Sequence, residues 1–120
     1  MATILVVDDD ETILLSVAEL LELEGFTVAT ASNGLEALDV TRERQPSLVL
    51  LDMRMPILDG WAYARALTEQ GLPRPKIVIM TAAHDAHRWA DEIGADAYLP
   101  KPFEADQLID TVTEIVGLKR

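Results

Sequence analysis

The feature that most constrains the fold of this chain is the apolar run at residues 48–51, which ends at the carboxylate of Asp52. A run this short and this apolar is typical of a strand buried on both faces, as in a parallel sheet covered by helices. Pro56, in the segment that follows, prevents the strand from continuing. Asp52 is therefore predicted at the carboxyl end of a buried strand, the edge at which open parallel sheets bind ligands. Taken alone, such a carboxylate is equally consistent with an aspartate that caps a turn.

The rest of the chain alternates between short apolar runs and helical patterns. The runs at 4–7 and 77–80 are also wholly apolar, whereas those at 27–30 and 97–99 are of mixed polarity. Between and after these runs, apolar residues recur with the spacing of one helix face. The predicted helical stripes are Ile13, Leu14, Val17, Leu20 and Leu21; Leu35, Leu38 and Val40; Trp61, Ala64 and Leu67; Trp89, Ala90 and Ile93; and Leu108, Ile109, Val112, Ile115 and Val116.

Polar residues, glycine and proline mark where these elements begin and end. Asp10 is predicted as the N-cap of the first helix, and Asn33 with Glu36 as a capping box for the second. Thr81 is expected to follow the fourth strand, and the prolines at 100–102 are expected to break the fifth.

Strands that alternate with helices predict a parallel sheet with right-handed crossovers. We therefore expect an α/β fold of five β–α units, a doubly wound (βα)5 arrangement. The wholly apolar first, third and fourth strands should be central, and the mixed second and fifth strands should be edges. That sorting predicts the flavodoxin-like strand order 2-1-3-4-5.

Composition limits the classes of protein to which the chain can belong. Its 120 residues are enough for one domain, expected over 1–120, and the absence of cysteine excludes a disulfide framework. The net charge of −11 argues against direct binding to nucleic acid and suits cationic partners or divalent metals, although solubility alone also explains it. Residues 1–4 lack the basic region of a signal peptide, and no apolar run approaches the ~18 residues of a membrane span. We expect a cytoplasmic protein that is not inserted in a membrane.

Polar side chains gather at the predicted carboxyl edge of the sheet. Asp8 and Asp9 follow the first strand, Asp52 the third, Thr81 the fourth and Lys101 the fifth. Carboxylates that converge repel one another unless a cation joins them, and a hard oxygen cluster suits Mg²⁺. The ammonium and the hydroxyl are donors for an anion, so the set predicts phosphoryl transfer with Asp52 as the nucleophile. Each residue alone has a simpler interpretation: a helix cap, a turn residue or a solvated lysine.

The order and spacing of five motifs identify a known family. They are residues 4–9; residues 51–56 with Asp59-Gly60; residues 80–82; residues 94–96; and residues 101–103. With these motifs, the chain resembles the receiver domain of bacterial two-component response regulators from residue 4 to about residue 116.

The resemblance implies a phosphoacceptor and a metal site. Asp52 would accept a phosphoryl group from a phosphohistidine on a sensor histidine kinase or a phosphotransfer protein. Asp9, Asp52 and the carbonyl of Arg54 would ligate Mg²⁺, with Asp8 acting mainly through water. In the family, the positions of Arg54 and Ala83 line the site and tune how long the phosphoryl group lasts. Arg54 would there either shield the acyl phosphate or hasten its hydrolysis.

The resemblance also implies a switch rather than an enzyme with turnover. Lys101 would pair with the phosphoryl oxygens, and its bond to Pro102 would be cis. Thr81 would move to the phosphoryl group and Tyr98 would swing inward behind it. The face of the fourth helix, fifth strand and fifth helix would then meet a downstream protein or an output domain outside this sequence.

Other interpretations fit these residues less well. A pseudo-receiver that is never phosphorylated is disfavoured by the complete set of acidic, hydroxyl and ammonium side chains. A flavin carrier would need phosphate-binding residues where the acidic residues 8–10 stand, and an aspartyl-phosphate hydrolase would need an acid in place of Arg54. His84 and His87 are more simply a solvated helix face than a second metal site. The sequence leaves open whether the chain is a stand-alone regulator or a piece of a longer protein.

Overall fold

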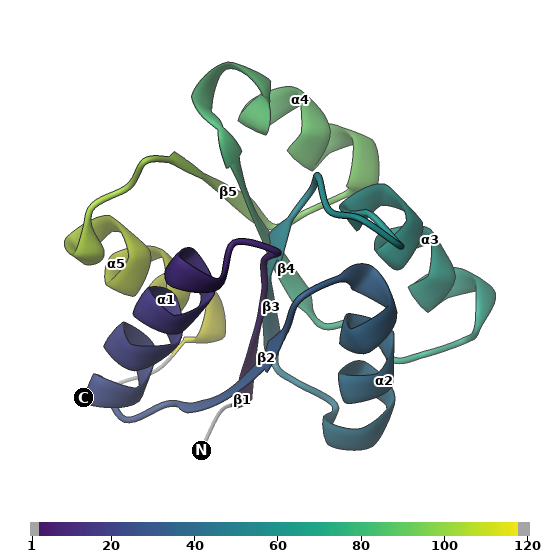
Figure 1. Ribbon diagram of the computed structural model, residues 1–120, viewed down its shortest axis with the longest axis horizontal. Coiled ribbons are helices and arrows are strands. Elements are labelled where there is room, and N and C mark those ends of the chain that lie inside the picture. Colours follow the sequence, from purple (N-terminus) through teal and green to yellow (C-terminus); the bar gives the residue numbers. More distant parts are fainter. Residues whose placement is uncertain (1–2, 118–120) are drawn as a thin grey trace.

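A computed structural model describes residues 3–117, except the side chain of Ala83, and shows one parallel sheet between two layers of helices (Figure 1). The strands are β1 Thr3–Val7, β2 Thr27–Ala31, β3 Leu48–Asp52, β4 Lys76–Ala82 and β5 Ala97–Lys101. The helices are α1 Glu11–Leu23, α2 Gly34–Arg44, α3 Gly60–Glu69, α4 Ala83–Ile93 and α5 Ala105–Val116. The strand order is β2-β1-β3-β4-β5, which confirms the predicted (βα)5 fold.

The three central strands are buried on both faces, as their uninterrupted apolar sequences predict. Alternate residues of a strand point to opposite faces of the sheet. One face packs against α2, α3 and α4, and the other packs against α1 and α5 (Figure 1). In β3, Val49 and Leu51 belong to the first core, and Leu48 and Leu50 to the second. None of these four side chains is exposed to solvent, so β3 carries Asp52 on a rigid support.

The N-caps of α1 and α2 are the residues that the sequence predicts, with one difference in their hydrogen bonds. The Asp10 side chain accepts hydrogen bonds from the amides of Thr12 and Ile13 and caps α1. Asn33 caps α2 by accepting from the amide of Glu36 at 2.9 Å. The capping box is nevertheless incomplete, because the Glu36 carboxylate accepts from the amide and hydroxyl of Ser32 and not from the amide of Asn33.

Three further predictions differ from the structure. Thr81 lies within β4 and not after it, and β5 continues through Pro100 to Lys101. Pro100 is tolerated there because β5 is an edge strand, where a missing backbone N–H costs no ladder bond on the solvent side. Leu35 is 52% exposed, because α2 turns Ala37, Leu38 and Thr41 toward the sheet instead.

The loop between β3 and α3 is held against the end of the sheet by backbone hydrogen bonds. The amide of Gly60 donates to the carbonyl of Met53, and the amide of Gly34 donates to the carbonyl of Leu58, each at 2.9 Å. A Cβ atom on Gly34 would lie 2.4 Å from that Leu58 oxygen. Glycine is therefore required where α2 meets this loop. None of the helices within residues 3–117 is long and apolar enough to cross a membrane.

We expect Gly34→Ala to lower the free energy of unfolding by about 1–3 kcal/mol, since the added methyl group forces the loop away from α2. Chemical denaturation measures this loss, and the amide NMR signals of residues 53–60 should shift with it. Gly71→Ala is the matched control, because Gly71 has a positive φ but nothing lies within 4 Å of the position that an added Cβ would take, and those loop signals should stay in place. Unchanged loop signals in Gly34→Ala would contradict the close contact.

Candidate functional site

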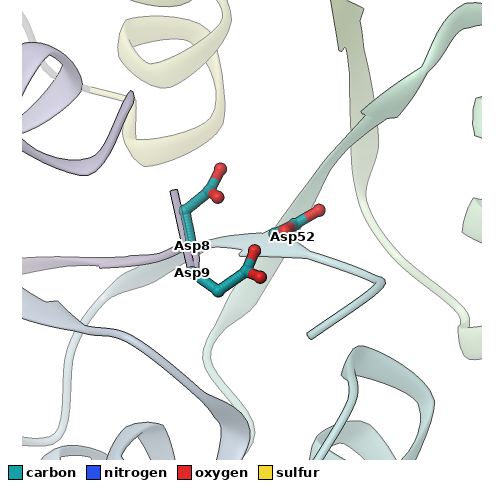
Figure 2. A group of neighbouring side chains, drawn as sticks. All are labelled: Asp8, Asp9 and Asp52. Carbon is teal, nitrogen blue, oxygen red and sulfur yellow. The ribbon is translucent and has the colours of Figure 1, made fainter. Parts of the chain in front are cut away.

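Three carboxylates converge at the carboxyl edge of the sheet. Asp8 and Asp9 follow β1, Asp52 ends β3, and one oxygen from each lies within 4.8 Å of the others (Figure 2). The parallel register produces this arrangement, since Val7, the last residue of β1, lies opposite Leu51 of β3. The predicted acid cluster is thus brought together by neighbouring strands.

The carboxylates differ in burial. Asp8 is 1% exposed and Asp52 7% exposed, whereas Asp9 is open to solvent. Burial, and after it the negative charge of Asp8, raises the pKa of the Asp52 carboxyl from 3.8 to about 7, although Lys101 acts in the opposite direction. The three carboxylates therefore carry more negative charge than Lys101 balances, and their oxygen donors fit a hard divalent cation such as Mg²⁺.

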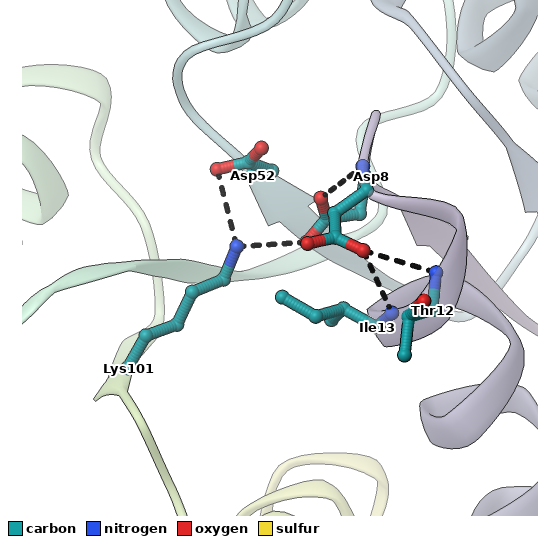
Figure 3. A network of polar contacts seen from close by, with 6 residues as sticks. Asp8, Thr12, Ile13, Asp52 and Lys101 are labelled. Atoms are coloured by element: carbon teal, nitrogen blue, oxygen red, sulfur yellow. Dashed lines mark hydrogen bonds and ion pairs between the residues drawn. The ribbon is translucent and has the colours of Figure 1, made fainter.

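Lys101 supplies the cation of the site. Its Nζ atom donates to Asp8 Oδ2 at 2.8 Å and lies 3.6 Å from Asp52 Oδ1 (Figure 3). The other oxygen of Asp8 accepts from the amide of Asp10 at 2.9 Å. The peptide bond between Lys101 and Pro102 is cis, as the resemblance implied.

The two residues expected to switch lie at different depths. Thr81 is 6% exposed and is the register partner of Pro100 on β5. Tyr98 is 41% exposed, and its ring meets the ring of His87 edge-on, with a centroid distance of 5.8 Å. Tyr98 is thus at the surface of β5 and α4 in this structure.

The side chain of Arg54 has contacts that sequence reasoning did not anticipate. Its guanidinium carbon lies 4.9 Å from the ring centroid of Trp89 and 6.0 Å from that of Trp61. Trp89 is 4% exposed and belongs to the core, as its place in a predicted helical stripe indicates. No signal along the chain links a loop arginine to rings on α3 and α4, which only the fold brings together.

The remaining candidates contribute little to this site. His84 and His87 are exposed and do not belong to the acid cluster, the one such group found within residues 3–117. The side chain of Ala83 lies outside the described residues.

Comparison with known proteins identifies the family. The profile described as "Response regulator receiver domain" matches residues 4–113. The chain belongs to this family. Its motifs, strand order and acidic edge are therefore those of a receiver domain, and the flavin carrier and the aspartyl-phosphate hydrolase are no longer needed as explanations.

Known relatives and solved structures agree with this assignment. The receiver is 40% identical over 107 residues to the response regulator MprA of Mycobacterium sp. (strain KMS), covering 88% of this chain and 46% of that protein. It is also 40% identical over 114 residues to the transcriptional regulatory protein PrrA of Mycobacterium tuberculosis, covering 94% of this chain and 49% of that protein. The chain thus spans about half the length of these relatives.

Two solved receiver domains have the same fold. The receiver domain of NtrX from Brucella abortus superposes with a TM-score of 0.85 at 32% identity, covering 97% of this chain and 99% of that one. A receiver domain protein from Clostridium thermocellum gives a TM-score of 0.85 at 34% identity, covering 98% and 95% of the two chains.

The raised pKa of Asp52 predicts a pH-dependent cost to stability. Asp52 titrates near 3.8 in the unfolded chain and near 7 in the folded one, so between these values the folded form binds more protons and its stability falls as pH rises. In EDTA, Asp52→Asn should therefore raise the free energy of unfolding by on the order of 1–4 kcal/mol at about pH 8, with the gain shrinking toward zero near pH 4.

Urea denaturation across this pH range measures the effect. Asp110→Asn, which removes a charge from an exposed position on α5, is the control and should change stability by less than about 0.5 kcal/mol throughout. A gain from Asp52→Asn that does not vary with pH would contradict the assigned titration.

Proposed function

We propose that this receiver domain accepts a phosphoryl group on Asp52 from a phosphohistidine of a sensor histidine kinase or phosphotransfer protein, with Mg²⁺ as cofactor. The observation that carries the proposal is the buried Asp52 carboxylate, at the end of a rigid strand, with Asp8 and Asp9 on one side and Lys101 3.6 Å away. Positioning and charge neutralisation are the main requirements of phosphoryl transfer.

The chain's own residues account for the transfer step. A carboxylate oxygen of Asp52 attacks the phosphorus, the bond from phosphorus to the imidazole nitrogen breaks, and the donor histidine leaves with its electron pair. Lys101, already directed between Asp8 and Asp52, compensates the negative charge that gathers on the transferred oxygens. The Thr81 hydroxyl, on the neighbouring strand, donates to the same group.

The cofactor would be held by the carboxylates of Asp9 and Asp52 and by the carbonyl of Arg54, with the carboxylate of Asp8 acting mainly through water. Hard oxygen ligands of this kind, with one carboxylate open to water, are those that Mg²⁺ prefers. When bound, Mg²⁺ supplies the positive charge that this cluster lacks and that the phosphoryl oxygens require.

The consequence of transfer is a switch and not repeated turnover. An acyl phosphate adds charge and acceptor oxygens at the end of β3, which draws Thr81 inward and leaves room for Tyr98 to follow. The altered face of α4, β5 and α5 then binds a downstream protein or an output domain of the same polypeptide. We place this event in the cytoplasm, with no direct contact between this domain and nucleic acid.

An apolar groove beside Lys101 suits the phosphodonor. The groove has a volume of about 550 Å³ and lies between α1 and the segment after β5, with Ile13, Val17, Leu20 and Phe103 among its lining residues. The apolar face of a donor helix fits such a groove and would bring its histidine to the carboxyl edge of the sheet.

Acetyl phosphate with Mg²⁺ should label the wild-type receiver with one phosphoryl group, detected by intact-protein mass spectrometry. Asp52→Asn should abolish labelling because the nucleophile is gone, and EDTA should suppress labelling of the wild type. Asp110→Asn, which removes a distant carboxylate, should label normally. Absence of label on the folded wild-type protein would establish the pseudo-receiver instead.

A charge placed inside the groove tests whether the phosphodonor binds there. Ser16, which lines the groove, is exposed, so Ser16→Glu should slow transfer from the cognate phosphodonor by about tenfold or more, a cost of about 1.4 kcal/mol. Acetyl phosphate labelling should be unaffected. The matched control is Leu15→Glu, since Leu15 is 60% exposed on α1 but lies outside this groove. Equal effects of the two variants would rule out the groove as the donor site.

A further inference from the structure

Arg54 is close to the acid cluster in sequence, yet its side chain is engaged elsewhere. It lies two residues after Asp52, a distance of about 6–7 Å along an extended chain. Within residues 3–117, the ion pairs of the acid cluster involve Lys101 and not Arg54. The Arg54 guanidinium lies over the rings of Trp89 and Trp61 instead.

These two rings, which we name the tryptophan platform, are held in place without Arg54. Trp61 of α3 and Trp89 of α4 meet edge to face, with centroids 4.8 Å apart and ring planes at 71°. The Trp61 Nε1 atom donates to Glu92 Oε1 of α4 at 2.9 Å. Trp89 is fixed by burial in the core. The platform is therefore a preformed aromatic site for a cation.

The strength of this contact is suited to reversible use. A cation–π contact at an exposed site changes an equilibrium constant by only about two- to fivefold, and Arg54 is exposed. A phosphoryl group on Asp52 would offer oxygens that a guanidinium can bind through two hydrogen bonds, and charge-assisted bonds of that kind are stronger than an exposed cation–π contact. The two sites for Arg54 are thus close enough in energy for one to compete with the other.

We propose that the tryptophan platform withholds Arg54 from Asp52 and competes for its guanidinium with a phosphoryl group bound there. Trp61 and Trp89 are then positioning residues, which act on the phosphorylation site only through Arg54. Release of Arg54 also removes a contact that ties the β3–α3 loop to α4, so occupancy of Asp52 is communicated to that helix. This inference rests on the proposed function.

The test is a double-mutant cycle on the affinity for beryllofluoride, a mimic of the phosphoryl group, in the presence of Mg²⁺. Isothermal titration calorimetry compares the wild type, Trp89→Leu, Arg54→Gln and the double variant. Trp89→Leu frees Arg54 and should tighten binding by about two- to fivefold, as loss of an exposed cation–π contact predicts. In the Arg54→Gln background, the same replacement should leave the affinity unchanged.

Trp89 is buried, so its replacement also lowers the stability of the protein. A second variant, at the other ring of the platform, tests the inference without that loss of core packing. Trp61→Leu alters a half-buried ring at the surface of α3 and should show the same dependence on Arg54 with a smaller effect. Arg88→Gln is the charge control, since it removes an exposed arginine of α4 that pairs with Asp85. Trp61→Leu should tighten binding in the Arg88→Gln background as it does in the wild type.

The outcomes separate this inference from the proposed function. Equal effects of the tryptophan variants with and without Arg54, or no effect in either background, would overturn the platform while leaving phosphorylation intact. Failure of the folded wild-type protein to bind beryllofluoride and to be labelled by acetyl phosphate would overturn the proposed function and this inference together.

Discussion

The electrostatic repulsion among three carboxylates at one edge of the sheet is the constraint on which this receiver domain depends. Two of them, Asp8 and Asp52, are almost completely buried, and Lys101 is the ammonium that faces both. Such an arrangement destabilises the folded chain unless positive charge arrives, and that imbalance is what the proposed chemistry uses. The apolar strands β1 and β3 supply the rigidity, because their burial on both faces prevents the acidic groups from moving apart.

The loop between β3 and α3 links this edge to the rest of the molecule. Backbone hydrogen bonds from Gly34 and Gly60 hold it close to α2 and to the end of β3. That fixed path directs the Arg54 side chain to the tryptophan rings of α3 and α4. Arg54 therefore links the proposed phosphorylation site at Asp52 to α4, which belongs to the proposed signalling face.

Much of the fold could be predicted because the pattern is local. Buried strands require unbroken apolar runs, so residues 4–7, 48–51 and 77–80 marked the central strands, and the mixed polarity of residues 27–30 and 97–99 marked the edges. The errors arose where tertiary contacts decide. Pro100 remains in β5 because β5 is an edge strand. Leu35 is exposed because α2 directs Thr41 inward, where its hydroxyl is hydrogen-bonded to Tyr63. The Glu36 carboxylate accepts a hydrogen bond from the amide of Ser32 and not from that of the N-cap residue.

By itself, the sequence determined the α/β fold, the order of the strands and the identity of the residues at the carboxyl edge. It could do so because hydrophobic periodicity and turn residues act over a few neighbouring positions. Only the tertiary structure decided the burial that raises the pKa of Asp52, the pairing of Lys101 with Asp8, and the stacking of Arg54 on Trp89. Each of these depends on distances between residues remote along the chain, which packing fixes and sequence spacing does not.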